Sequence, residues 1–201
     1  MTNKIFARAI VTIMVIFISA LPVSSVFASK KGRRGGALRT FGDYAQIINP
    51  VIAGGVSSKE KGLGHFLIIY GESLVITHAT KFIASSQKWG PSKRPTIANK
   101  KDRYDGMPSG HTNSAWFAAS YIRNFSNEYS YLAVPLYVTA AITGISRVKS
   151  KEHTALQVVS GAALAEIVNI FNSKLAWSNN YRSVKVSLSP KGGTLGFKFN
   201  F

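Results

Sequence analysis

The sequence predicts a mainly α-helical protein, and three observations carry this prediction. Most of the chain consists of apolar stretches of helix length, separated by short segments rich in Gly, Pro and charge. The length of 201 residues suits one domain with a single core, preceded by a processing segment. Only residues 179–201 show the alternation typical of strands, so we expect a C-terminal β-hairpin appended to a helical bundle.

Residues 1–28 have the pattern of a secretory signal peptide. Lys4 and Arg8 precede an apolar run from Ala9 to Leu21, and small residues lead to a cleavage site after Ala28. An uncleaved anchor is the alternative, because about 20 apolar residues can cross a bilayer. In both cases we expect an exported protein, in the periplasm or at the periplasmic face of the inner membrane.

Residues 29–62 are interpreted as a basic N-terminal segment ahead of the folded domain. The run Lys30-Lys31-Gly32-Arg33-Arg34 suits a tether to a lipid surface, with a solvated tail as the alternative. The whole chain has 25 Lys and Arg against 8 Asp and Glu, a formal net charge of +17. Such a charge suits an anionic partner, and we predict a membrane surface rather than nucleic acid.

The domain itself is predicted over residues 63–178. Its apolar stretches are Glu60–Phe82 (one or two helices, because Gly71 interrupts the pattern), Thr112–Phe125, Tyr131–Ile145 and Ala155–Trp177. Their lengths suit either a soluble helical core or short membrane spans. The polar stretch Gln87–Gly106 is predicted to be a loop that runs into the next helix.

Two short blocks within this domain carry the chemistry. Pro108-Ser109-Gly110-His111 is followed, 35 positions after His111, by Ser146-Arg147 and then by His153, and Arg94-Pro95 lies upstream. A transferring phosphoryl group needs mainly positioning and positive charge, which arginine forks and backbone amides supply. One imidazole can attack the phosphorus while another donates a proton.

The composition excludes other routes to phosphate transfer. The chain has no Cys, so a thiolate nucleophile is absent. Its eight carboxylates are scattered and form none of the dense ligand sets that a two-metal site requires. We therefore predict a reaction without metal or cofactor, through a phosphohistidine.

The blocks resemble the motifs of the type 2 phosphatidic acid phosphatase superfamily, which includes lipid phosphatases, bacterial acid phosphatases and vanadium haloperoxidases. The resemblance covers roughly residues 63–175 and rests on the order of R-P, P-S-G-H and S-R-x5-H. It implies a helical bundle, a nucleophilic His153 and a proton-donating His111. It also implies phosphate binding by Arg94, Ser109, Gly110 and Arg147.

Two positions depart from the family pattern. The first motif requires a lysine where Gln87 stands, and Lys81 or Lys88 is the candidate replacement, with Lys81 slightly favoured. Gln157 replaces the aspartate that orients the nucleophile. An amide oxygen can fix the imidazole tautomer but adds no charge. From sequence alone, Gln157→Asp is therefore expected to raise the rate about tenfold.

The favoured function is hydrolysis of a phosphomonoester or diphosphate on an envelope lipid. Candidate substrates are an anionic phospholipid (phosphatidylglycerophosphate or phosphatidate), an isoprenoid diphosphate (undecaprenyl diphosphate) and a lipid A phosphate. The alternatives are a periplasmic acid phosphatase of broad specificity and a non-catalytic cationic protein that binds the envelope. A vanadium haloperoxidase is disfavoured because those chains are usually much longer.

Overall fold

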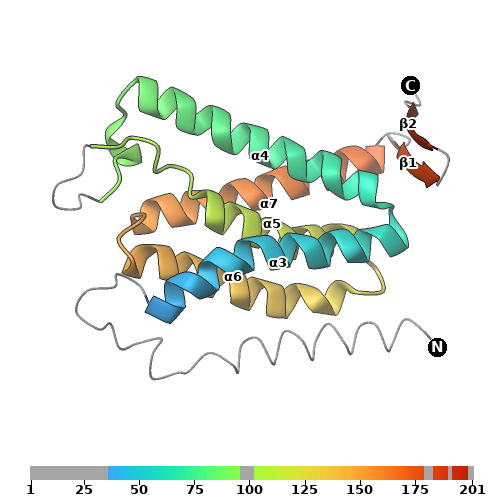
Figure 1. Cartoon of the computed structure of the whole chain (residues 1–201), viewed down its shortest axis with the longest axis horizontal. Coiled ribbons are helices and arrows are strands. Elements are labelled where there is room, and N and C mark those ends of the chain that lie inside the picture. Colours follow the sequence, from blue (N-terminus) through green and yellow to red (C-terminus); the bar gives the residue numbers. More distant parts are fainter. Residues whose placement is uncertain (1–35, 96–101, 179–182, 190–191, 199–201) are drawn as a thin grey trace.

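The computed structural model describes residues 36–95, 102–178, 183–189 and 192–198, and within them it is a helical bundle (Figure 1). Its helices are α3 (Gly36–Glu60), α4 (Leu63–Ser86), α5 (Gly110–Phe125), α6 (Ala133–Lys149) and α7 (Ala155–Ser178). Two short 3-10 turns, η1 (Gly90–Ser92) and η2 (Ser130–Leu132), lie in the connections. The predicted signal peptide and the basic run at 30–34 lie outside the described residues.

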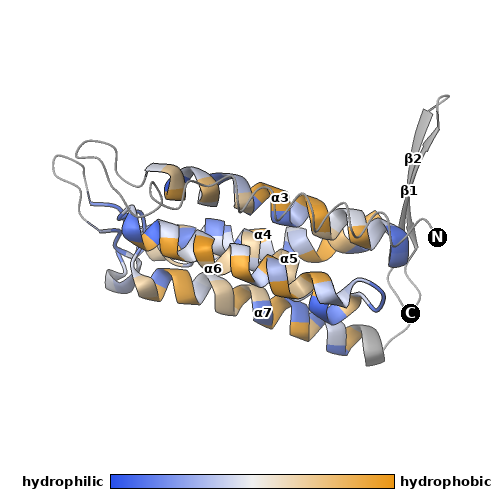
Figure 2. Ribbon diagram, turned by 90° about the horizontal axis from the view of Figure 1, so that it is seen from below, coloured by the Kyte–Doolittle hydropathy of each residue, from blue (hydrophilic) through white to orange (hydrophobic). Residues whose placement is uncertain are grey.

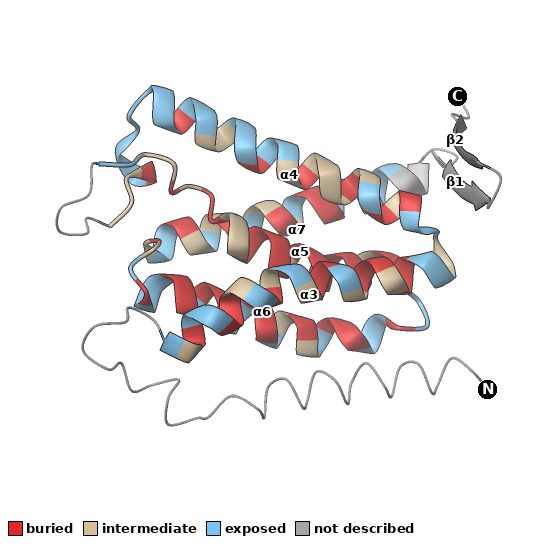
Figure 3. Ribbon diagram, in the orientation of Figure 1, coloured by how far each residue is buried: buried red, intermediate tan, exposed pale blue. Residues whose placement is uncertain are grey.

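Helix α5 forms the centre of the bundle and contacts α3, α4, α6 and α7. It is buried along most of its length, as Figure 3 shows. Small residues such as Ala115, Ala118 and Ala119 are fully buried on it and let the neighbouring helices approach closely. Phe117 and Tyr121, also on α5, pack against Phe66 of α4 with ring centroids 6.0 and 5.1 Å apart.

Helix α3 was not expected from the sequence, where residues 29–62 were interpreted as a basic segment. The helix buries a stripe at helical spacing that includes Leu38, Phe41, Ala45, Ala53 and Val56. Pro50 and several glycines lie inside or just before it, and these residues weaken the local helix signal. Packing of the stripe against α5 and α6 outweighs the low intrinsic propensity.

The other helices agree better with the sequence predictions. Helices are confirmed over Thr112–Phe125 and Ala155–Trp177, and α4 extends four residues beyond the predicted end at Phe82. Gly62, with φ of 89°, makes the turn between α3 and α4, because this left-handed conformation favours glycine. The polar stretch after α4 is irregular apart from η1 in the described residues.

Strands β1 (Ser183–Ser189) and β2 (Gly192–Lys198) pair antiparallel, with Ser183 opposite Lys198. The side chains of both strands and residues 190–191 of the predicted turn lie outside the described part of the chain. How an appended hairpin packs on the helices or on a partner stays a prediction.

Among the residues that the structure describes, three helices are long and apolar enough to cross a membrane. The candidate spans are Leu63–Ser86, Ser130–Lys149 and Ala155–Leu175, each with a mean hydropathy of 1.3 over its most apolar window. Many apolar side chains on α4, α6 and α7 are exposed. Figure 2 colours the apolar residues of the bundle orange on the ribbon. Only 22% of the apolar window of α4 is buried. These exposed faces indicate a membrane-associated protein.

Candidate active site at one end of the bundle

The predicted site residues, apart from Lys88, come together at one end of the bundle. Helix α4 ends there, α5 begins there, and the turn between α6 and α7 lies beside them (Figure 1). Each of these elements and the connection after η1 supplies one or more of the predicted groups, which are Lys81, Arg94, Ser109, Gly110, His111, Arg147, His153 and Gln157.

His153 lies in the turn between α6 and α7 and is almost completely buried. Its backbone N–H donates to the carbonyl of Arg147 over 3.2 Å, so the turn fixes its place relative to the end of α6. Burial, and then the positive charges of Arg94 and Lys81, lower the pKa of His153 to about 3. The imidazole is therefore neutral near pH 7, as a nucleophile must be.

The side chain of Gln157 lies one helical turn beyond His153 and contacts two segments at once. Its Oε1 lies 3.1 Å from Nδ1 of His153, and its Nε2 donates to the carbonyls of Pro91 (3.0 Å) and Lys93 (2.8 Å). Both amide hydrogens are used on these carbonyls, so the oxygen faces the imidazole. Nδ1 of the neutral ring then carries the proton, and Nε2 keeps its lone pair.

Gly106 allows this arrangement because it leaves room for the amide. A Cβ at Gly106 would lie 2.5 Å from Oε1 of Gln157. The backbone N–H of Gly106 donates to the carbonyl of Ser92 over 2.9 Å, which ties the polar connection back onto η1. The segment that carries Arg94 is thus held by a hydrogen bond within the polar connection and by the hydrogen bonds from Gln157 at the start of α7.

Arg94 and Lys81 are both held by Asp105. Nε of Arg94 donates to Oδ1 of Asp105 over 2.8 Å, and Nζ of Lys81 donates to its backbone carbonyl over 2.7 Å. Burial alone would raise the pKa of the Asp105 carboxyl, but hydrogen bonds from Arg94 and Arg103 outweigh it and lower that pKa. Arg94 is therefore oriented by a carboxylate that stays ionised, and Lys81 is oriented by the backbone carbonyl of the same residue.

Arg147 is buried at the end of α6 and reaches α3. Its Nη1 lies 2.8 Å from Oδ1 of Asp43, and its Nη2 donates to the carbonyl of Arg39 over 2.7 Å. The same Oδ1 of Asp43 lies 3.3 Å from Nε2 of His111. Burial and the charge of Arg147 lower the pKa of His111 to about 4, although Asp43 acts in the opposite direction.

Ser109 and Gly110 form the beginning of α5 beside these cations. Ser109 is fully buried at the N-cap position, and its Oγ accepts a hydrogen bond from Oγ1 of Thr112 over 3.1 Å. A Cβ at Gly110 would lie 3.9 Å from Cε of Lys81, so the lysine stem approaches the first turn. The free N–H groups of a helix N-terminus favour an anion, and here buried or half-buried cations surround them.

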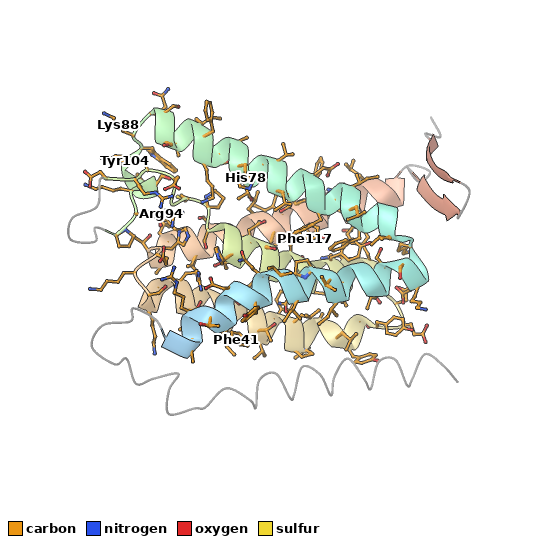
Figure 4. The ribbon with its side chains drawn as sticks, viewed as in Figure 1. Phe41, His78, Lys88, Arg94, Tyr104 and Phe117 are labelled. Atoms are coloured by element: carbon orange, nitrogen blue, oxygen red, sulfur yellow. The ribbon has the colours of Figure 1, made fainter. Side chains whose placement is uncertain are left out.

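Of the two candidate lysines, only Lys81 lies within this group. Lys88 lines an open cavity of about 560 Å³ together with Ser85, Asp102, Arg103, Tyr104 and Asp105. Figure 4 shows Lys88 and Tyr104 toward the outer end of the molecule, with Arg94 closer to the helices. His78 is exposed on α4, away from the site.

Three carboxylates at this end of the bundle were not predicted from the sequence to belong to the site. Asp43, Asp105 and Glu152 contact the predicted cations, with Oε2 of Glu152 lying 3.7 Å from Nη1 of Arg94. In the sequence they stand out only as rare residues, because the whole chain has eight Asp and Glu against 25 Lys and Arg. Across residues 36–95 and 102–178, no group of three His, Asp or Glu side chains suited to holding a metal ion comes together.

Comparison with known proteins adds the family. Residues 64–181 match the model of the PAP2 superfamily. A lipid A 4'-phosphatase of Helicobacter pylori (strain J99 / ATCC 700824) is 31% identical over 142 residues, or 64% of this chain. The chain thus matches 65% of that relative's length, slightly less than two thirds.

A solved structure shares the fold. The structure of the first transmembrane PAP2-type phosphatidylglycerolphosphate phosphatase from Bacillus subtilis superposes with a TM-score of 0.52 at 16% identity, covering 88% of this chain and 98% of that one. The family match spans more than half of the chain and includes all three motif blocks. The protein therefore belongs to the PAP2 superfamily.

Proposed function

We propose that the protein is a phosphatase that removes phosphate from an envelope lipid through a phosphohistidine on His153, without a metal ion. The observation that carries this proposal is the convergence of the imidazoles of His153 and His111 with Arg94, Arg147 and Lys81 at the N-terminus of α5. Positive charge fixed in a buried site stabilises the charge that develops on phosphoryl oxygens.

The proposed reaction has two steps. In the first, the lone pair on Nε2 of His153 forms a bond to phosphorus as the bond to the leaving oxygen breaks. The electron pair of that bond stays on the leaving oxygen, which takes a proton from His111. In this proposal the negative charge of the bound phosphate raises the pKa of His111, so that the ring is protonated before the transfer and neutral after it. In the second step water attacks the phosphohistidine, His111 takes up the proton of the water, and the phosphorus–nitrogen bond breaks to release phosphate and restore His153.

Phosphate oxygens would be bound by the two arginines, by Lys81 and by the hydroxyl and amide groups of Ser109 and Gly110. Lys88 lines the neighbouring open cavity, which shares Asp105 with this group, and is not included among the proposed phosphate ligands. Gln157 would orient the nucleophile by accepting the proton on Nδ1 of His153. These roles follow from residue chemistry and from the positions of the side chains.

Two lines of support favour a lipid substrate. The exposed apolar faces of α4, α6 and α7 suit a protein whose site opens beside a bilayer. The relatives are named for lipid A 4'-phosphate and for phosphatidylglycerolphosphate. We therefore place a lipid A phosphate and a phosphatidylglycerophosphate first among the substrates, with phosphatidate and an isoprenoid diphosphate as further candidates.

The site is proposed to face the periplasm, with residues 1–28 directing export and the C-terminal hairpin covering part of the bundle or a partner. Sequencing the N-terminus of envelope-associated protein tests the first part. A chain that begins at Ser29 supports cleavage of a signal peptide, whereas an intact N-terminus supports a retained anchor.

Trapping the intermediate tests the mechanism. The full-length protein in detergent micelles is mixed with ³²P-labelled lipid phosphate and quenched rapidly. We expect acid-labile label on His153, none in His153→Ala, inhibition by vanadate and no effect of EDTA. Loss of activity with EDTA that zinc or magnesium restores contradicts the metal-free route.

Substrate range separates the remaining functions. Release of phosphate from lipid phosphates in strong preference to small aryl phosphates supports the lipid enzyme, and equal release from both supports a broad-specificity acid phosphatase. No release from either class, together with binding to anionic vesicles, identifies a non-catalytic envelope-binding protein.

A further inference from the structure

A carboxylate from α3, Asp43, joins two of the proposed active-site groups. Its Oδ1 lies 3.3 Å from Nε2 of His111 and 2.8 Å from Nη1 of Arg147. Asp43 stands outside the residues that match the family model, 64–181, and outside all three motif blocks. None of the roles assigned so far includes it.

The backbone next to Asp43 is shaped for this approach. A Cβ at the preceding residue, Gly42, would collide with Oγ of Ser146 and lie 2.9 Å from Nη2 of Arg147. Glycine therefore allows α3 to lie close to the end of α6. The carbonyl of Arg39, one turn earlier, accepts a hydrogen bond from Arg147 as well, so α3 holds this end of α6 at two points.

The two imidazoles of the site have different partners. Nδ1 of His153 faces the neutral amide of Gln157, whereas Nε2 of His111 faces the carboxylate of Asp43. A carboxylate stabilises a protonated imidazole, and an amide supplies no net charge. The imidazole with the charged partner is thus the one suited to hold and release a proton.

The other charges around His111 make this partner necessary. Arg147 from α6 and Arg94 from the polar connection both act against protonation of the ring, as does burial. Asp43 is the anion that opposes them. A donor of protons in so positive a site needs a fixed anion on its second nitrogen.

We propose that Asp43 is a positioning residue that prepares His111 for protonating the leaving group. It holds the proton on Nε2, so that Nδ1 is the atom that gives its proton to the leaving oxygen in the first step. After this transfer His111 is neutral, Nε2–H still faces Asp43, and the lone pair on Nδ1 accepts the proton of the attacking water in the second step. This inference rests on the proposed phosphatase function.

The test compares leaving groups. Rates of the full-length protein in detergent micelles are measured with 4-nitrophenyl phosphate, whose leaving group needs little protonation, and with phenyl phosphate, whose leaving group is more basic. We expect Asp43→Asn to lower kcat for phenyl phosphate about tenfold more than for 4-nitrophenyl phosphate, as loss of general acid catalysis requires. Asp43→Glu should recover most of this difference.

Glu152→Gln is the matched control. Glu152 is a carboxylate at the same end that pairs with Arg39 and Arg94. Its loss removes the same charge and should change the rates of both substrates by the same factor. Asp43→Ser also removes the carboxylate and serves if Asp43→Asn does not yield folded protein.

The outcomes separate this inference from the proposed function. The role of Asp43 is overturned if the Asp43 variants lose the same factor in rate with both substrates. It is also overturned if Glu152→Gln shows the same difference between the two substrates as Asp43→Asn. Both outcomes leave the phosphatase function intact. If the wild-type protein hydrolyses neither the aryl phosphates nor a lipid phosphate, the phosphatase function fails and the inference fails with it.

Discussion

At the scale of single residues, Gln157 shows how a replacement can acquire a second task. Its oxygen serves His153, as an aspartate would, but its nitrogen also holds the carbonyls of Pro91 and Lys93. Those carbonyls belong to the segment that leads directly into Arg94. An aspartate has no hydrogens to offer them, so the amide links the nucleophile to the segment that positions a phosphate ligand.

These two contacts reverse the effect expected for Gln157→Asp. The new charge would gain roughly 1–2 kcal/mol at His153, but two partly buried carbonyls would each lose a donor at about 1–3 kcal/mol and face a carboxylate. We expect the free energy of unfolding to fall by about 2 kcal/mol and kcat to drop below that of the wild type. Chemical denaturation and steady-state kinetics measure both. A variant that is faster than the wild type and equally stable shows that the link to 91–93 is dispensable.

The buried His153 also makes the stability of the folded protein depend on pH. Its pKa of about 3 in the fold lies below its ordinary value of 6.5. Between these two pH values the unfolded chain binds a proton that the folded chain does not, so stability falls as the pH drops through this window. His111 acts in the same direction.

We therefore expect the thermal unfolding midpoint of the wild type to fall between pH 7 and pH 5, and to fall less in His153→Asn. Calorimetry or intrinsic fluorescence in detergent provides the midpoint. Equal shifts in the two proteins indicate that the folded state accepts a proton on His153 readily, contrary to its burial among cations.

At the scale of elements, the site depends on how closely α7 approaches the beginning of α5. A Cβ at Gly161 of α7 would lie 2.5 Å from the backbone carbonyl of Ser109 and 3.3 Å from the N–H of Asn113. Backbone atoms cannot swing aside as a side chain can. The absence of a side chain at this one position thus sets the place of the first turn of α5.

Gly161→Ala is expected to push the two helices apart. Overpacking of this kind costs about 1–3 kcal/mol, and the shift of Ser109 and Gly110 should lower kcat as well. Gly55→Ala on α3 is the control, because nothing lies within 4 Å of a Cβ there and alanine favours a helix. Thermal unfolding and phosphate release are compared for both variants. Equal behaviour of the two shows that the α5–α7 approach does not limit the site.

The elements also show which sequence signals were strong. Helices α5 and α7 follow from long stretches without Gly or Pro breaks, apart from Gly161, and the polar connection follows from its composition. Helix α3 did not follow, because its glycines and Pro50 are typical of loops when tertiary contacts are ignored. Asp43 lies on α3. Because this helix was not predicted, Asp43 was not predicted as part of the site either.

At the scale of the whole molecule, the candidate site lies at one end of helices whose outer faces are apolar. Helix α4, with 24 residues, is long enough to cross the hydrocarbon core of a bilayer, and only 22% of its apolar window is buried (Figure 3). In a bundle that spans a bilayer, a site at one end lies at the depth of the lipid headgroups. This position suits a substrate whose phosphate is at the interface and whose chains remain in the bilayer.

The side of the membrane that the site faces can be tested directly. The chain has no cysteine, so a single introduced cysteine can be labelled selectively. Lys149→Cys places an exposed thiol at the site end of α6, and Ser130→Cys places one at the opposite end. If the site faces the periplasm, an impermeant maleimide should label the first variant in intact cells and the second only after lysis. The reverse pattern puts the site in the cytoplasm, where excess Lys and Arg are common.

The sequence by itself determined the helical class, the three motif blocks and the chemistry of two imidazoles among cations. These depend on local periodicity and on residue types at short spacing, which the chain displays directly. The tertiary structure decided which lysine lies among the cations at this end of the bundle, which nitrogen of His153 faces Gln157, and that Asp43 stands beside His111 and Arg147. Asp43 and Arg147 are 104 positions apart in the sequence, and helix packing rather than any local pattern brings their side chains together.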